Sequence, residues 1–259
     1  MKTDIETAAA AAAEARRRVR PFDMPQGLGG APFADAYAFQ DAYVAAVGKP
    51  VAGYKLAVNG APQQAHFGVS EPAWARIFAG EVYPSGAALP LAGFDSVSIE
   101  PEICAVLGAG VELFTGPVDR AEALQAIDCF RPAIELIDQR GVPMPQLDLA
   151  QAIALNVFNA GIVLGEGRIA PEALELPALT VALTLDGTPV AEVTGAAPQD
   201  PVEAVAWLLS ALHARGLHAA PGMVVMCGTH LPLRTLEPAV RSVAVTMRGL
   251  GEVAFTLTD

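Results

Sequence analysis

Cysteine is scarce in this sequence, and the three cysteines show neither the spacing of a disulfide framework nor that of a metal-binding motif. Cys104, Cys129 and Cys227 are odd in number and form no CxxC pair. We therefore expect reduced thiols that serve as small core residues, a cytoplasmic location and no cysteine-based zinc site.

Long apolar runs are missing as well. The two longest uncharged stretches, between Asp148 and Glu166 and between Arg215 and Arg234, are interrupted by polar residues, Gly and Pro. Both fall short of the roughly 20 apolar residues that a membrane-spanning helix needs, so we expect no membrane partner.

Positive charge is in deficit, with 16 Lys and Arg against 28 Asp and Glu and a net charge of −12. A basic surface for nucleic acid is therefore not expected. The four histidines show no HExxH spacing, and the nucleotide-binding and GxSxG motifs are missing. A metal site would have to use oxygen ligands, and a divalent cation would supply the positive charge that an acidic ligand requires.

Hydrophobic patterning predicts an α+β (mixed) protein with a smaller helical N-terminal portion over residues 1–80 and a strand-rich domain over residues 81–259. Asp186-Gly187 and residues 248–251 predict hairpin turns. Predicted helices cover residues 5–20, 32–46, 120–130, 149–156 and 201–215, with helical turns at 62–67 and 71–78. Predicted strands cover residues 51–58, 87–91, 97–107, 131–137, 162–164, 179–185, 223–227, 242–247 and 252–257.

Two glutamates lie two residues apart in one of the apolar runs. In a strand, Glu100 and Glu102 point to the same face, where two buried carboxylates would repel each other unless a cation lay between them. Glu135 is a third acid inside an apolar run. Carboxylate ligands suit Mg²⁺ or Mn²⁺. The competing interpretations are two solvated acids on an exposed strand, and a salt bridge from Glu135 to Arg131 or Arg140.

Other polar residues also interrupt apolar runs. Lys55 lies in a short hydrophobic strand, where it could act as an acid or base or anchor a carboxylate, or could protect an edge strand from aggregation. Gly228 and Thr229 end another strand and could bind an oxyanion. Asn156 and Asn159 are either substrate ligands or satisfied caps.

These pieces, in this order, resemble the fumarylacetoacetate hydrolase superfamily, in particular its 2-keto-4-pentenoate hydratase and 4-oxalocrotonate decarboxylase branch. The resemblance spans about residues 35–258. It is carried by Gly-Tyr-Lys-Leu at 53–56, Ile-Glu-Pro-Glu-Ile at 99–103, Pro-Ala-Ile-Glu at 132–135, Ala-Leu-Asn at 154–156, Val-Met-Cys-Gly-Thr at 225–229 and Gly-Leu-Gly-Glu-Val at 249–253.

The resemblance implies a β-roll of mixed sheets and a homo-oligomeric lyase of aromatic meta-cleavage catabolism. It would act on a small 2-oxo or 2-hydroxydienoic acid through a metal-stabilised enolate. The metal, Mg²⁺ or Mn²⁺, would lie on Glu100, Glu102 and Glu135, with Lys55 as the catalytic residue. The implied substrate-binding residues are Ser85, Asn156, Gly228 and Thr229.

Departures from the family pattern leave the exact reaction open. Ser85 and Leu155 replace acids that hydratases usually carry, and Phe158 replaces a small hydroxyl residue, which favours a larger or more apolar substrate tail. One alternative is an acylpyruvate-type C–C hydrolase that uses His66 and Glu71. The other is a non-catalytic member that binds a metal and a carboxylate.

Overall fold

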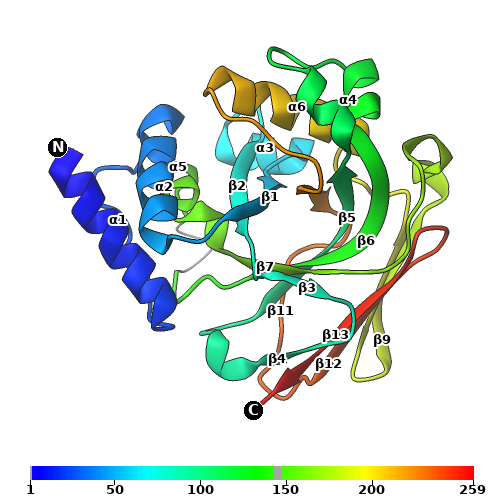
Figure 1. The fold of residues 1–259 in the computed structure, drawn as a ribbon. Coiled ribbons are helices and arrows are strands. Elements are labelled where there is room, and N and C mark those ends of the chain that lie inside the picture. Colours follow the sequence, from blue (N-terminus) through cyan, green and yellow to red (C-terminus); the bar gives the residue numbers. More distant parts are fainter. Residues whose placement is uncertain (1, 143–146) are drawn as a thin grey trace.

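The computed structural model describes residues 2–142 and 147–259, which form two mixed β-sheets flanked by helices (Figure 1). The larger sheet is eight-stranded, and its strands run in the order β2-β1-β10-β5-β6-β7-β3, with β11 paired to β5. The smaller sheet has the order β4-β13-β12-β8-β9. Both sheets are open. The predicted α+β class and the roll of mixed sheets are confirmed.

The strands have the following bounds. In the larger sheet they are β1 (Val51–Ala57), β2 (Ala73–Phe78), β3 (Val82–Pro84), β5 (Ser98–Leu107), β6 (Ile127–Ile137), β7 (Asn159–Leu164), β10 (Val224–Thr229) and β11 (Arg234–Thr235). In the smaller sheet they are β4 (Ala87–Pro90), β8 (Thr180–Leu185), β9 (Thr188–Thr194), β12 (Ser242–Met247) and β13 (Gly251–Thr258).

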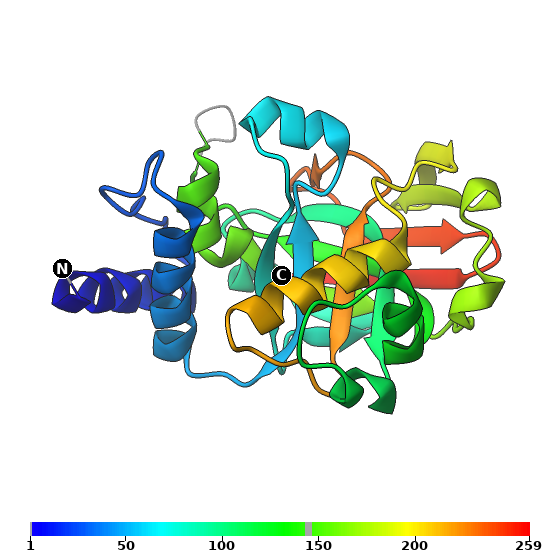
Figure 2. The ribbon, with the colours of Figure 1, turned by 90° about the horizontal axis from the view of Figure 1, so that it is seen from above.

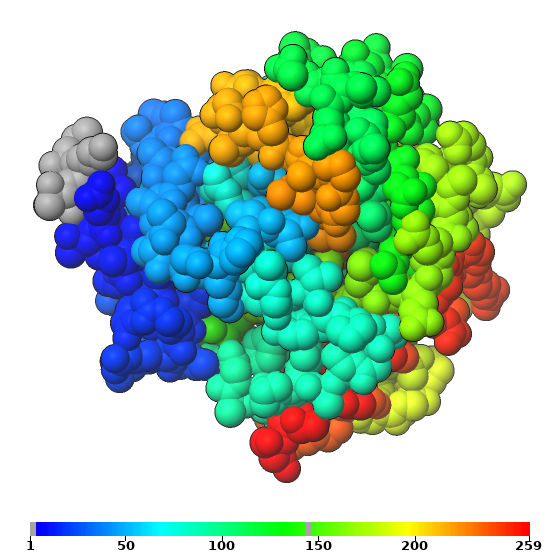
Figure 3. Space-filling view, in the orientation of Figure 1, coloured from blue at the N-terminus to red at the C-terminus, as the bar shows by residue number. Residues whose placement is uncertain are grey.

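Helices lie on two sides of the larger sheet (Figures 1 and 2). α1 (Lys2–Arg17), α2 (Phe33–Val47) and α5 (Leu149–Ala154) pack together beside it, and Figure 3 shows the blue N-terminal residues along one side of the molecule. α3 (Ala61–Phe67) lies between β1 and β2 in the chain, and α4 (Arg120–Ala126) packs against α6 (Pro201–Ala214). No helix of the described residues is both long enough and apolar enough to cross a bilayer.

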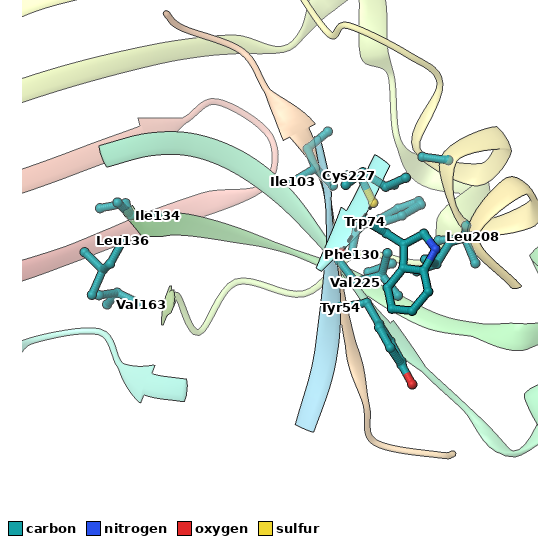
Figure 4. Close-up of a cluster of buried hydrophobic side chains, with 14 of the residues drawn as sticks. Tyr54, Trp74, Ile103, Phe130, Ile134, Leu136, Val163, Leu208, Val225 and Cys227 are labelled. Atoms are coloured by element: carbon teal, nitrogen blue, oxygen red, sulfur yellow. Dashed lines mark hydrogen bonds between the residues drawn. The ribbon is translucent and has the colours of Figure 1, made fainter. Parts of the chain in front are cut away.

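The main core covers one face of the larger sheet, with α6 packed over one part of that face and strands of the smaller sheet over another. Trp74 on β2, Phe130 on β6 and Leu208 on α6 are fully buried there and lie close together (Figure 4). α6 forms where expected because Asp200 caps it, accepting hydrogen bonds from the N–H groups of Val202 and Glu203. A helix with this apolar face buries enough surface to fix the sheet beneath it.

Most predicted elements are confirmed, including both hairpins, but two are wrong. Residues 73–78 form the buried strand β2 and no helical turn, because pairing with β1 outweighs the weak local preference of this segment. The helix predicted for 120–130 ends at Ala126, and β6 begins at Ile127. β1 and β2 belong to the same sheet as β5 and β6, and the division of the chain near residue 80 stays a prediction.

Candidate metal centre and active-site cavity

Strand alternation separates the main core from a charged cluster on the opposite face of the larger sheet. Tyr54 and Leu56 of β1 point into the main core, and Lys55 therefore points the other way. On β5, Ile103 belongs to the main core, whereas Glu102 shares the opposite face with Cys104. Lys55, Glu100 and Glu102 thus lie on the same side of the sheet.

Three carboxylates meet on that face. Glu100 on β5 is the direct cross-strand partner of Glu135 on β6, and Glu102 lies one pleat further along β5. Each offers a carboxylate oxygen, and these oxygens all lie within 4.8 Å of one another. Glu102 and Glu135 are fully buried, while Glu100 is half-buried in a cavity wall. The three glutamates therefore do not lie on a solvent-exposed strand face, as the competing interpretation expected for Glu100 and Glu102.

Lys55 is the positive member of the cluster. Its Nζ lies 3.2 Å from Oε1 of Glu135, and both side chains are buried. β1 lies between β2 and β10, so Lys55 does not protect a sheet edge. When ionised, three carboxylates and one ammonium leave an excess of two negative charges, which is the charge of one divalent cation.

The alternative partners of Glu135 are engaged elsewhere. Arg131 donates to the main-chain oxygen of Gly165, and Arg140 pairs with Asp138. Glu135 is instead held by Asn159, whose Nδ2 donates a 2.9 Å hydrogen bond to Oε1. Oε2 of Glu135 has no hydrogen-bond partner among the described residues. A buried carboxylate oxygen without a donor is a position suited to a metal ligand.

Burial and mutual repulsion perturb the carboxyl groups. Burial, reinforced by the charge of Glu135, raises the pKa of Glu100 to about 7 although Lys55 opposes the shift. Burial and the charges of Glu135 and Glu100 raise the pKa of Glu102 well above its ordinary value, opposed by the N–H of Gly228. Burial alone would lower the pKa of Lys55, but the surrounding carboxylates outweigh it and raise that pKa. The cluster therefore favours protons or a cation, and its oxygen donors fit a hard divalent ion.

The charged face forms the floor of a cavity of about 290 Å³. Lys55, Glu100, Glu102, Gly228 and Thr229 all line it, so the structure brings five of the predicted site residues together. The remaining wall comes from Leu56, Ala57, Val58, Asn59, Gln63, Phe67, Ile137, Gln139, Leu147, Leu149, Ala152, Val157, Phe158, Pro232 and Leu233.

Three amides of this wall were missed by the sequence reasoning. Asn59 and Gln63 follow β1, and Gln139 follows β6, so none interrupts an apolar run. Nε2 of Gln139 is buried and has no hydrogen-bond partner in the described part of the chain. A free donor in the cavity wall can bind an oxygen of a ligand. The one sequence signal for these amides was their position just after predicted strands, because the loops that follow strands commonly carry functional side chains.

Two residues predicted as substrate ligands, Asn156 and Ser85, lie outside this cavity and bind the main chain instead. The amide of Asn156 is fully engaged with the backbone of Arg76: its Oδ1 accepts from the N–H, and its Nδ2 donates to the carbonyl, both at 2.8 Å. It is therefore a buried structural bridge. Oγ of Ser85 accepts from the N–H of Ala254 and ties β3 to β13. Neither residue lines the cavity.

A strained turn shapes the cavity beside α5. Asn156, Val157 and Phe158 have successive φ values of 56°, 45° and 55°, a left-handed conformation that β-branched and aromatic residues rarely adopt. The turn places Val157 and Phe158 in the cavity wall and starts β7 at Asn159. Strain of this kind persists where the surrounding structure fixes it, and it is concentrated at functional sites.

The residues of the hydrolase alternative do not meet in this cavity. His66 and Glu71 are both exposed, and neither lines the wall. The ring of His66 packs edge-on against Phe67. The geometry therefore offers no buried Glu–His pair at this position to activate water.

Comparisons with known proteins agree with this geometry. No family model matches the chain. It is 31% identical over 209 residues to a 4-oxalocrotonate decarboxylase from Pseudomonas sp., covering 80% of this chain and 78% of that protein. It is 29% identical over 208 residues to a 2-keto-4-pentenoate hydratase from Paraburkholderia xenovorans, covering 79% and 76%.

Solved structures show the same fold. The 4-oxalocrotonate decarboxylase from Pseudomonas putida G7, complexed with magnesium and adipate, has a TM-score of 0.88 at 25% identity and covers 100% of this chain and 98% of its own. A fumarylpyruvate hydrolase from Pseudomonas aeruginosa, in complex with Mn²⁺ and pyruvate, has a TM-score of 0.61 at 18% identity, covering 81% and 91%.

Proposed function

The chain belongs to the family of the 2-keto-4-pentenoate hydratases and 4-oxalocrotonate decarboxylases, within the fumarylacetoacetate hydrolase-like superfamily, and we propose that its cavity is the active site of a divalent-metal-dependent lyase. The substrate is a small 2-oxo or 2-hydroxydienoic acid, and the reaction is hydration or decarboxylation. The observation that carries the proposal is the meeting of three carboxylates and one lysine in a cluster whose Glu100, Glu102 and Lys55 line the floor of one cavity.

Glu100, Glu102 and Glu135 hold the metal, which we propose to be Mg²⁺ or Mn²⁺. Their oxygens lie close enough to share one ion, and its two charges balance the excess of the cluster. Solved relatives are complexed with magnesium or Mn²⁺. When bound, the ion supplies Lewis-acid charge beside the carboxylate and the 2-keto oxygen of the substrate.

Lys55 supplies the mobile proton in this proposal. Hydration adds a proton and a hydroxyl across a carbon–carbon double bond, and decarboxylation leaves an electron pair on carbon that takes up a proton. Both reactions need a donor next to the substrate, and Nζ of Lys55 lies in the cavity wall beside the metal ligands. The same ammonium can hold the substrate carboxylate.

Neutral groups orient the substrate. Thr229 and Gly228 contact it from the end of β10, and Nε2 of Gln139 donates to one of its oxygens from the end of β6. Phe67 and Phe158 shield the reacting atoms from water.

The test is an assay of the purified full chain with 2-hydroxypenta-2,4-dienoate and with 4-oxalocrotonate, following ultraviolet absorbance and released CO₂. We expect turnover of at least one substrate, its loss in EDTA, and its return with Mg²⁺ or Mn²⁺. Lys55→Met should abolish turnover while Mn²⁺ still binds. Binding of Mn²⁺ and pyruvate without turnover of either substrate would instead favour the non-catalytic alternative.

We further propose that the protein is a cytoplasmic homo-oligomer. All three thiols are free and buried, as expected in a reducing compartment, and 53% of the residues are hydrophobic. Light scattering coupled to size-exclusion chromatography measures the oligomeric state.

A further inference from the structure

The cavity changes character with distance from the metal ligands. Its floor carries the charges of Lys55, Glu100 and Glu102, whereas the wall beyond them is built largely from hydrocarbon side chains. Phe67 reaches it from α3 and Phe158 from the left-handed turn, and Leu233 follows β10 in the chain. A substrate bound by its 2-oxo acid end would therefore extend its remaining carbons over apolar surface.

Positive charge is confined to the floor. Lys55 is the one Lys, Arg or His among the described residues of the cavity wall, and it is already paired with Glu135. Residues 143–146, which precede the wall residue Leu147 in the chain, carry no charged side chain. A second carboxylate on the ligand would lose its water without gaining a cation, which is strongly unfavourable.

The amides of the wall do not replace such a cation. Nδ2 of Asn59 already donates to the carbonyl of Cys227 and to Oε1 of Gln199. Gln139 retains a free N–H donor, which suits a neutral hydroxyl or carbonyl oxygen. The wall is thus matched to a ligand with a neutral oxygen along its length and an uncharged end.

Building on the proposed function, we propose that the substrate is a monocarboxylic 2-oxo acid, or its dienol, with an apolar tail, and that the cavity selects against dicarboxylic acids of the same length. The solved relative with magnesium holds adipate, a dicarboxylate, so this chain would differ from it in the charge accepted at the far end of the ligand.

The experiment is calorimetric titration of the Mg²⁺-loaded full chain with pyruvate, 2-oxoheptanoate and 2-oxoheptanedioate. Each buried methylene strengthens binding about fourfold, so we expect 2-oxoheptanoate to bind at least ~10-fold more tightly than pyruvate. We expect 2-oxoheptanedioate to bind at least ~10-fold more weakly than 2-oxoheptanoate.

A positive charge introduced into the wall should reduce the preference for the monocarboxylate. Leu233→Lys places an ammonium beside the tail and should improve the dicarboxylate relative to the monocarboxylate by about tenfold. Leu113→Lys is the matched control, because Leu113 is 72% exposed and lies outside the cavity.

The outcomes separate the two proposals. Tight pyruvate binding with equal or stronger binding of the dicarboxylate, or turnover of a dicarboxylate with release of CO₂, would overturn the specificity and leave the metal-dependent lyase intact. Failure of pyruvate to bind the Mg²⁺-loaded protein would instead overturn the lyase itself, and the specificity with it.

Discussion

The main-chain N–H of Gly228 donates a 2.7 Å hydrogen bond to Oε2 of Glu102. The contact lies where the pairing of β10 with β5 shifts register between Met226 and Thr229. An irregularity in the sheet thus turns a backbone donor toward a proposed metal ligand and fixes which of its oxygens stays free.

Replacing Gly228 with alanine should disturb this arrangement. Its φ is +103°, and a Cβ would lie 2.5 Å from Oδ1 of Asn59 and 2.7 Å from Cγ of Pro198. We expect a loss of about 1–3 kcal/mol in unfolding free energy and about tenfold weaker Mn²⁺ binding. Urea unfolding and calorimetry measure the two effects. Gly222→Ala is the control, since Gly222 also has a positive φ but no atom within 4 Å of the added Cβ. Equal effects in both variants would show that only backbone strain matters.

Replacing Glu100 with glutamine should have opposite effects on stability and binding. The variant keeps the side-chain size but removes one of three repelling carboxylates, so the metal-free protein should unfold at a higher temperature in EDTA. Mn²⁺ affinity should fall by about 100-fold or more, because a ligand is lost. Thermal unfolding with and without Mn²⁺ tests both. Glu112→Gln, on the exposed surface, should change neither; a melting temperature of Glu100→Gln below that of the parent in EDTA would contradict the repulsion.

Metal binding should strengthen as pH rises. The pKa of Glu100 is about 7, and burial together with the charge of Glu135 raises the pKa of Glu102 well above its ordinary value, so both groups must release protons when a cation binds. We expect Mn²⁺ affinity to rise at least tenfold between pH 6 and pH 8, as measured by calorimetry in buffers of different ionisation enthalpy. A pH-independent affinity would show that the carboxylates are already ionised.

Stability of the metal-free protein should follow the opposite course. The folded-state pKa of Glu100 lies above its unfolded value, so its protonated form stabilises the fold at low pH. That contribution is present below about pH 4.5 and is lost as pH rises through 7, by on the order of 1–3 kcal/mol. Urea unfolding in EDTA at pH 5 and pH 8 measures it, and saturating Mn²⁺ should cancel the loss.

Asn159 should act as a positioning residue for Glu135. Its Nδ2 donates a hydrogen bond to Oε1 of Glu135, and its main-chain carbonyl oxygen accepts a 2.6 Å hydrogen bond from Nη1 of Arg16 on α1. Asn159→Ala should weaken Mn²⁺ binding by about 10-fold, and Asn159→Asp by more, because it adds a charge to a crowded cluster. Calorimetry compares these with Gln26→Ala, an exposed amide. Unchanged affinity in Asn159→Ala would remove this role.

The sequence was most informative where a polar residue interrupts an apolar strand. Glu100, Glu102, Glu135 and Lys55 were predicted in this way, and the structure places them together. Strand periodicity alone put Glu100 and Glu102 on one face, but it could not give the β5–β6 register that sets Glu135 opposite Glu100.

The same signal also marks a polar group that binds the backbone. Asn156 also interrupts an apolar run, yet both ends of its amide bind the main chain of Arg76. A sequence shows that a buried amide needs partners but not whether they are backbone or ligand. Gln139 gave no pattern at all, because its role depends on a cavity built from distant segments.

The alternation of β1 and β5 leaves the hydrophobic mass that stabilises the domain on one side of the larger sheet and the reactive groups on the other. Residues around the proposed substrate tail, such as Phe158 and Leu233, line the cavity and pack in a different hydrophobic cluster from the core beneath α6 in Figure 4. Side chains of the cavity wall can therefore be exchanged to change which tail is accepted, without altering the packing beneath α6 or the charged cluster.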